Sequence, residues 1–173
     1  VTVVSLALAA YLVGQGVHAP LEALTQSTFN LVSVITTTGY ASADYTQWGA
    51  FSVALFFVVM FIGGCSGSTS GGMKVFRFQL SYLFLRSQVR KLVHPSGVFV
   101  TQYNGKPVSD DIILSAIAFS FLFFLCLAGF TLLLALMGLD LMTSLTASAT
   151  ALTNVGPGLG DIVGPAGNFA TLP

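Results

Sequence analysis

Residues 112–137 contain no charged side chain, and this uninterrupted stretch decides the class of protein. As one helix, Asp111–Gly138 would be roughly 42 Å long, which exceeds the ~30 Å hydrocarbon core of a bilayer. The whole chain is 54% hydrophobic and only 7% charged, whereas soluble domains carry about 25% charged residues. We therefore expect an all-α integral membrane protein. Its net charge of zero argues against nucleic acid as a partner.

Other apolar stretches predict helices that are too short to cross a bilayer by themselves. Val1–Gly14 is typical of a membrane helix that lacks its start, while Trp48–Ile62 and Met73–Leu85 are predicted to be the halves of one interrupted crossing. Cys65 and Cys126 lie in or beside these apolar runs, where we expect unpaired, buried thiols. The cysteines therefore indicate nothing about the redox compartment.

Basic residues cluster after the interrupted crossing, and this asymmetry predicts the orientation. The cluster comprises Lys74, Arg77, Arg86, Arg90, Lys91 and Lys106. The other connections contain no Lys or Arg and carry the acidic residues Glu22, Asp44, Asp140 and Asp161. By the positive-inside rule, residues 86–109 are predicted to be cytoplasmic in a multi-pass protein of the inner or plasma membrane. Asn104-Gly105, between extended-looking flanks, predicts a small hairpin in this loop.

Two segments rich in Ser and Thr, Pro20–Ile35 and Asp140–Leu152, look helical but are too short to span a bilayer. A Thr- or Gly-rich segment follows each of them, "TTTGYASAD" after the first and "TNVGPGLGD" after the second. A shift of 117 residues aligns the two units. The repeated order of span, half-helix and Thr/Gly segment predicts two re-entrant units of the same kind.

Such a unit suits the binding of a dehydrated cation. The C-terminal end of a half-helix carries a partial negative charge, and the strand after it can offer carbonyl oxygens in place of water. Gly39 and Gly156 permit backbone angles that other residues resist. We therefore expect a carbonyl-lined selectivity filter in each unit. The alternative is a pair of re-entrant loops that only pack together.

The segment "GGCSGSTSGGMK" at 63–74 interrupts an apolar crossing with a flexible, polar stretch. It does not match a nucleotide-binding P-loop, because Met73 stands where that motif requires lysine. A nucleophile elbow, G-x-S-x-G, is absent as well, so an enzyme is the discarded class. A glycine-rich kink that lets helices pack closely remains open.

A gate is the favoured function of this segment, because it lies midway down the crossing that follows a filter. Glycine and serine allow several backbone states of similar energy, as a movable barrier requires. The candidate gate residues are Gly63, Gly64, Ser66, Gly67, Ser68, Thr69, Ser70, Gly71, Gly72 and Lys74. We expect Lys74 to pair with an acidic group on another helix or with carbonyls of the loop, and to oppose a resting cation.

The motifs "TTTGY", "TNVGPGLG" and "GGCSGSTSGGMK" resemble the Trk/Ktr/HKT superfamily of potassium transporters, and within it the bacterial TrkH-type subunits. That resemblance implies four span–pore helix–span repeats around one pore. This chain would be a fragment that holds the third repeat at 1–91, with its first helix truncated and its second helix interrupted at 63–73. The fourth repeat would follow at 109–173 without its last helix, after a cytoplasmic loop at 92–108.

The resemblance also assigns functions. It implies uptake of potassium, no bound cofactor, a homodimer in membrane lipid, and a nucleotide-binding regulatory subunit on the cytoplasmic side. Arg86–Lys91 would touch that subunit or anionic lipid headgroups. Ion coordination would fall to Thr37, Thr38, Gly39, Tyr40, Asn154, Val155, Gly156 and Pro157. Because Asn154 and Pro157 depart from the stricter channel pattern, the alternatives are permeation of sodium or mixed cations, or a non-conducting subunit that keeps the pore fold.

Overall fold

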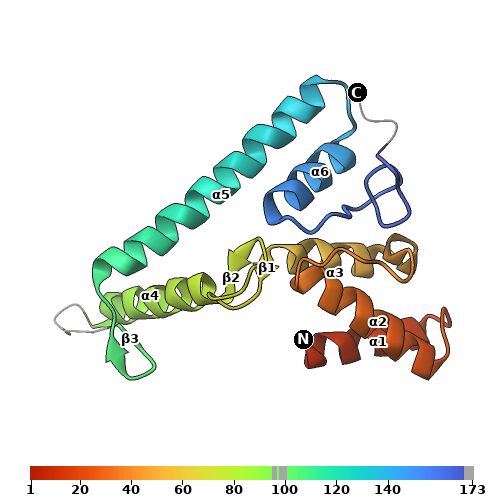
Figure 1. The fold of residues 1–173 in the computed structure, drawn as a ribbon. Helices are drawn as coiled ribbons and strands as arrows, with labels where there is room; N and C mark the ends of the chain where they lie inside the picture. The colour runs from red at the N-terminus through yellow and green to blue at the C-terminus, as the bar shows by residue number, and fades with distance from the viewer. Residues whose placement is uncertain (95–96, 98–100, 170–173) are drawn as a thin grey trace.

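The computed structural model describes residues 1–94, 97 and 101–169, and regular structure in this part of the chain is mostly helical (Figure 1). The helices are α1 (Thr2–Gly14), α2 (Pro20–Ile35), the 3₁₀ helix η1 (Tyr45–Trp48), α3 (Ala50–Met60), α4 (Val75–Val93), α5 (Asp110–Leu136) and α6 (Leu141–Thr153). Two pairs of very short strands complete the fold: β1 (Ile62–Gly63) with β2 (Met73–Lys74), and β3 (Gln102–Tyr103) with β4 (Lys106–Pro107).

Helix α5 is the predicted span. Its 27 residues give a length of roughly 40 Å, and in the described part of the chain it is the one helix long and apolar enough to cross a membrane. It runs from the end where α4 and the β3–β4 hairpin lie to the end where α6 begins (Figure 1). The short helices α2 and α6 were expected as half-helices, and they lie within one residue of the predicted bounds.

The segments predicted to form one interrupted crossing correspond to α3 and α4, which lie on either side of the β1–β2 pair (Figure 1). Helix α3 is shorter than the predicted Trp48–Ile62, because Gly49 at φ 98° separates Trp48 from the helix. Helix α4 is longer than predicted and continues past Leu85 to Val93. The apolar pattern ends at Leu85, but Arg, Lys and Gln are good helix formers, and Arg90 and Lys91 favour a helix C-terminus.

The predicted hairpin is confirmed. Strands β3 and β4 are antiparallel, and the turn residues Asn104 and Gly105 have φ angles of 50° and 75°, as a type I′ turn requires. The Tyr103 hydroxyl donates a 3.0 Å hydrogen bond to Gln79 Oε1 of α4, so the hairpin is fixed against that helix. The part of the expected flank at 98–100 lies outside the described residues.

An aromatic cluster fixes the chain between α2 and α3. The rings of Tyr45 and Phe56 stack with centroids 4.1 Å apart, and Trp48 lies edge-on against Tyr45. All three side chains are buried, and the core continues into Leu12 of α1 and Leu31 of α2. The long connection after α2 is therefore held at its far end by packing.

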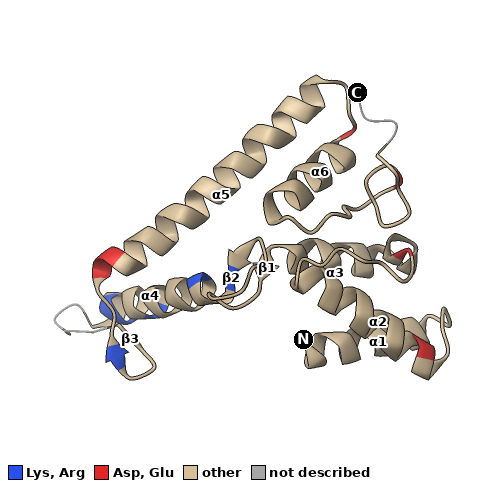
Figure 2. Cartoon of the chain, in the orientation of Figure 1, with Lys and Arg blue, Asp and Glu red and all other residues tan. Residues whose placement is uncertain are grey.

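Lys and Arg are confined to one part of the molecule, where they gather on β2, α4 and the β3–β4 hairpin (Figure 2). Asp110 and Asp111, in the first turn of α5, lie beside this basic region. The other acidic residues, Glu22, Asp44, Asp140 and Asp161, belong to segments without Lys or Arg. Helix α6 begins at the end of α5 opposite the basic hairpin (Figure 1). The confinement of Lys and Arg is what the predicted orientation requires, since the positive-inside rule counts basic residues and not net charge.

The cysteine prediction is wrong in one respect. Both thiols are unpaired, but Cys65 is exposed and Cys126 is half-buried. Cys65 begins the exposed part of the segment between β1 and β2, after the end of α3.

Candidate ion filter and gate

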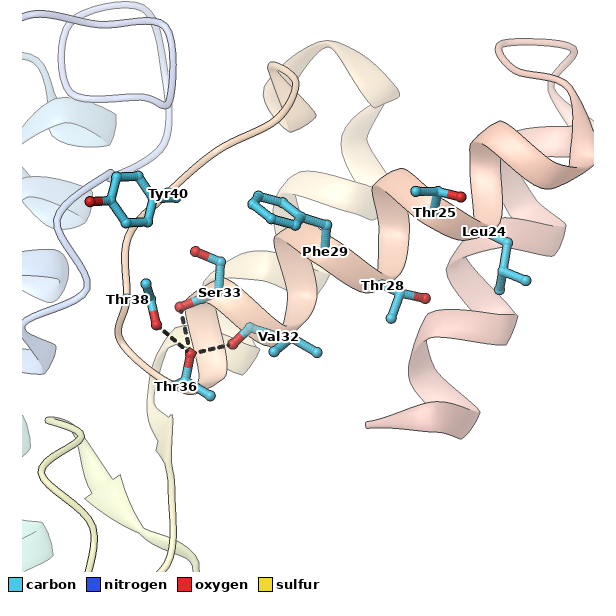
Figure 3. A pocket seen from close by; sticks show the side chains of 9 residues that line it. All are labelled: Leu24, Thr25, Thr28, Phe29, Val32, Ser33, Thr36, Thr38 and Tyr40. Atoms are coloured by element: carbon cyan, nitrogen blue, oxygen red, sulfur yellow. Dashed lines mark hydrogen bonds between the residues drawn. The ribbon is translucent and has the colours of Figure 1, made fainter.

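The first candidate filter segment starts directly at the end of α2. The Thr36 hydroxyl donates a 2.7 Å hydrogen bond to the Val32 carbonyl and lies 2.8 Å from the Thr38 hydroxyl (Figure 3). Thr37 has a left-handed φ of 56°, which is rare for a β-branched residue. The Thr38 N–H then returns to the Ser33 carbonyl at 2.9 Å, so the chain turns sharply off the helix.

The second candidate filter segment leaves α6 in the same way. Asn154 caps the helix with a left-handed φ of 57°, and the Val155 N–H returns to the Thr150 carbonyl at 3.2 Å. The Thr153 hydroxyl donates a 2.8 Å hydrogen bond to the Ala149 carbonyl. Asparagine tolerates the left-handed region better than threonine does.

The shift of 117 residues also superposes these contacts. The left-handed residue, the returning N–H, the helix-end hydroxyl and the glycine of positive φ fall on equivalent positions in both segments. Gly39 has φ 80° and Gly156 has φ 104°. The two segments therefore share one backbone arrangement, which the few sequence identities alone could only suggest.

The two segments also face each other. A Cβ atom added at Gly39 would collide with the Val155 carbonyl oxygen, and one added at Gly156 would lie 4.0 Å from the Gly39 Cα. Gly39 is thus required twice, for its positive φ and for this close approach. The structure thus brings Gly39 against Val155, Gly156 and Pro157 of the predicted filter residues, while Tyr40 is 73% exposed.

The electrostatics of the two segments favour a cation without any charged side chain. Neither 36–43 nor 153–160 contains a charged residue, and each follows a helix C-terminus, where the macrodipole is negative. Helix α2 also anchors the far end of the segment that follows it. Asn30 donates to Ser42 Oγ at 2.9 Å and accepts from the Ser42 N–H at 3.0 Å, so it clamps the chain beyond Tyr40.

The second segment is anchored through threonines instead. Thr146 Oγ1 donates to the Leu159 carbonyl at 2.8 Å, and Thr150 Oγ1 donates to the Pro157 carbonyl at 3.2 Å. Neither these anchors nor Asn30 was predicted from the sequence. The sequence held a signal for them, namely polar residues within short apolar helices. Such side chains need hydrogen-bond partners when they are buried, as these are.

The candidate gate is a closed loop rather than a loose connection. Strands β1 and β2 are parallel, with Ile62 opposite Met73 and Gly63 opposite Lys74, so they close the loop at its base. Inside it, the Gly64 N–H donates to Ser70 Oγ at 2.8 Å. The remaining predicted gate residues Ser66, Gly67, Ser68 and Thr69 form its exposed part, and Gly71 and Gly72 lead back to β2.

Lys74 holds the loop from within. Its Nζ donates to the Ser68 carbonyl at 2.8 Å and to the Ser70 carbonyl, and both hydroxyls of these serines lie 3.4 Å away. Of the two partners expected for Lys74, the loop carbonyls are the ones it contacts in the described part of the chain.

The loop of the candidate gate contacts both candidate filter segments. The Gly71 N–H donates a 3.1 Å hydrogen bond to Thr37 Oγ1. A Cβ at Gly71 would collide with the Thr153 carbonyl oxygen and lie 3.0 Å from Asn154 Cβ. The loop therefore lies directly against the helix-proximal ends of the two filter segments.

Two hollows adjoin this region. One of about 440 Å³ lies between the gate loop, α4 and α5, and its lining includes Ser66, Lys74, Arg77 and Asp111. The other is an open groove of about 600 Å³ along α2, shown in Figure 3, which ends at Tyr40. The first has charged side chains in its lining and adjoins the candidate gate, whereas the second is an apolar helix face beside the first candidate filter segment.

Comparison with known proteins agrees with this geometry. The family model for TrkH, described as a cation transport protein, matches residues 1–172. The Trk system potassium uptake protein TrkI of Halomonas elongata is 60% identical over 170 residues, which cover 98% of this chain and 34% of that protein. The Trk system potassium uptake protein TrkH of Vibrio parahaemolyticus is 34% identical over 148 residues, covering 83% of this chain and 30% of that protein.

A solved structure agrees as well. The crystal structure of the potassium transporter TrkH from Vibrio parahaemolyticus matches with a TM-score of 0.86 at 32% identity, over 92% of this chain and 34% of that chain. The present chain spans about a third of the length of these relatives. It has the all-α fold of a membrane transporter. By sequence match, identity and structure, this chain belongs to the TrkH family of cation transport proteins.

Proposed function

We propose that this chain forms part of the conduction pathway of a potassium uptake transporter. The observation that carries the proposal is the pair of segments at 36–43 and 153–160, which share one backbone arrangement and approach each other at Gly39 and Val155. Relatives that are 60% and 34% identical are named as potassium uptake proteins.

In this proposal, backbone carbonyls of the two segments replace part of the water shell of a potassium ion. The C-terminal ends of α2 and α6 carry partial negative charges that attract the ion. Because these charges are smaller than that of a carboxylate, the ion can still leave. The coordinating residues are those of the two filter segments: Thr37, Thr38, Gly39, Tyr40, Asn154, Val155, Gly156 and Pro157.

The loop between β1 and β2 is the proposed gate. Its contacts with Thr37 and Thr153 support a position directly under the filter, and the hollow of about 440 Å³ beside it offers room for displacement. The hydrogen bonds from Lys74 to the Ser68 and Ser70 carbonyls support one defined resting conformation of the loop rather than a flexible kink. A gate needs such a state with a second arrangement of similar energy.

The proposal extends to the assembly. The complete transporter is a homodimer in the inner or plasma membrane, carries no bound cofactor and catalyses no covalent reaction. Its cytoplasmic side meets a nucleotide-binding regulatory subunit near the basic end of α4. That end, Arg86–Lys91, is helical and rich in cations, which suits an acidic protein surface or anionic headgroups.

The test is a flux assay on the complete transporter in liposomes, with potassium, rubidium and sodium offered in turn. We expect potassium and rubidium to enter and sodium to be discriminated against. Equal entry of all three would favour mixed-cation permeation. Absence of any flux from correctly assembled protein, with and without the regulatory subunit, would contradict the proposal and favour a non-conducting subunit.

A further inference from the structure

The ammonium group of Lys74 lies in a cage of oxygen atoms that belongs to the gate loop itself. Four oxygens from two residues surround Nζ: the carbonyl and hydroxyl oxygens of Ser68 and of Ser70. The two hydroxyls are themselves 2.8 Å apart, so the cage keeps its shape through an internal hydrogen bond. Lys74 itself lies opposite Gly63 in the strand pair that closes the loop.

This set of ligands is the kind that proteins use for potassium. Neutral carbonyl and hydroxyl oxygens replace water around a dehydrated monovalent cation, and an ammonium group is close to potassium in size and carries the same charge. No acidic side chain contributes to the cage, so its chemistry selects a single positive charge and not a divalent ion. Ser68 is exposed and Ser70 is buried, which leaves one side open for water on a bound ion.

We propose that Ser68 and Ser70 form a monovalent-cation site inside the gate, and that the Lys74 ammonium fills this site in the closed state as a tethered substitute for the transported ion. The inference rests on the proposed function, since it adds an ion position in the proposed gate, beneath the proposed filter. Withdrawal of Lys74 frees the cage for potassium, so the same oxygens hold the gate shut and then assist passage.

Proximity to the filter supports this assignment. Ser70 is followed by Gly71, whose N–H is bonded to Thr37 and whose Cα faces the Thr153 carbonyl. An ion that leaves the filter on this side therefore meets the loop next to the cage. On the other side, the hollow of about 440 Å³ includes Lys74 in its lining, which gives the side chain a place to move.

The experiment uses Rb⁺ as the probe, because its anomalous scattering identifies it in crystals. Crystals of the complete transporter in Rb⁺ are compared for wild type and Lys74→Met, a variant that keeps an apolar stem and loses the ammonium. We expect Rb⁺ at the filter in both proteins and an additional Rb⁺ beside Ser68 and Ser70 only in Lys74→Met. The additional peak should disappear when Ser70→Ala is combined with Lys74→Met.

Arg77→Met is the matched control. Arg77 also lines the hollow, but its guanidinium lies 3.9 Å from the Phe119 ring centroid and has no part in the cage. This variant loses one positive charge in the same region and should show no additional ion. An ion beside Ser68 in Arg77→Met would indicate a general electrostatic effect and would overturn the inference.

The outcomes separate the inference from the proposed function. Rb⁺ at the filter without Rb⁺ in the cage of Lys74→Met overturns the inference alone, whereas no Rb⁺ at the filter of wild type counts against the proposed function. A second readout is thermal stability. Replacing choline in the buffer with K⁺ should raise the melting temperature of Lys74→Met more than that of Arg77→Met, because K⁺ binds the free cage. Failure of Lys74→Met to assemble in K⁺ also contradicts the inference, because K⁺ should then fill the cage.

Discussion

The backbone N–H of Gly71 donates a 3.1 Å hydrogen bond to Thr37 Oγ1, and this contact joins the loop between β1 and β2 to the first filter segment. Thr37 can offer its hydroxyl there because its backbone is left-handed, with φ 56°. The proposed filter and the proposed gate are thus joined by a hydrogen bond. We therefore expect a substitution in one of these parts to alter the conformation of the other.

Thr37→Val tests this bond, because valine has a similar shape and lacks the hydroxyl. Loss of one hydrogen bond that leaves a partly buried N–H unpaired costs about 1–3 kcal/mol. We expect the closed state to weaken and basal potassium flux to rise by roughly 5-fold or more in the absence of the regulatory subunit. Thr37→Ser keeps the hydroxyl and should remain near wild type. Equal behaviour of the two variants would show that the bond does not contribute to closure.

Gly71→Ala tests the contact between the loop and the end of α6. The new methyl group would meet the Thr153 carbonyl, which is backbone and cannot rotate away. We therefore expect the loop to move off the filter and basal flux to rise. Gly67→Ala is the control, since no atom lies within 4 Å of a Cβ at that position. A rise in both variants would point to general loosening of the loop.

Gly39→Ser is expected to weaken discrimination against sodium. The side chain must adopt φ near 80° and collides with the Val155 carbonyl, so the carbonyl cage has to distort. Gly156→Ser is the comparison: it has similar backbone strain, at φ 104°, but its new side chain meets no atom closer than 4.0 Å. We expect it to lose less selectivity than Gly39→Ser does. The relative permeability of potassium and sodium measures both. Unchanged selectivity in Gly39→Ser would remove this residue from the filter.

The clamp between Asn30 and Ser42 should govern the outer end of the first filter segment. Asn30→Leu removes both hydrogen bonds and leaves the Ser42 N–H without its side-chain partner, at a cost of about 1–3 kcal/mol. Ser42→Ala removes only one of the two. We expect a graded loss of selectivity and of melting temperature, larger for Asn30→Leu. The reverse order would show that Asn30 does not position the filter.

Local signals in the sequence predicted the helices well. Pro20 fits the first turn of α2, and the bounds Pro20–Ile35 agree with the structure because the segment ends in a Thr-rich turn. The hairpin at Asn104-Gly105 followed from its turn type. The end of α4 was predicted too early, at Leu85, because the apolar pattern stops there. The helix itself continues to Val93 through basic residues that are good helix formers.

Contacts between distant segments were not accessible from sequence. Gly71 and Thr37 are 34 residues apart, and their residue types do not predict that they form a hydrogen bond. The contacts of Lys74 were accessible in part, because carbonyls of the loop were among its expected partners, but the choice of Ser68 and Ser70 was not predicted. Asn30 is different, because a buried amide in a short helix already implies a partner, although not which one. Periodicity and composition describe elements, while the site depends on how two re-entrant units meet.

The last prediction concerns deletion of Ser66–Ser70 in the complete transporter. The deletion removes both serines that hold Lys74, and it shortens the link between β1 and β2 so far that their parallel pairing must open. If the loop obstructs the pore, flux per correctly assembled protein should rise and should depend less on the regulatory subunit.

A loop that is only a packing kink predicts the opposite sign. Its removal would misalign α3 against α4, so assembly and flux would fall together. Thr69→Ala, a change at an exposed position of the same loop, should leave flux near wild type and controls for substitution within the loop. Size-exclusion chromatography reports assembly, and potassium uptake into liposomes reports flux. A deletion variant that assembles normally and conducts no faster than wild type would exclude the gate, because nothing would then remain under the filter to account for the unchanged barrier.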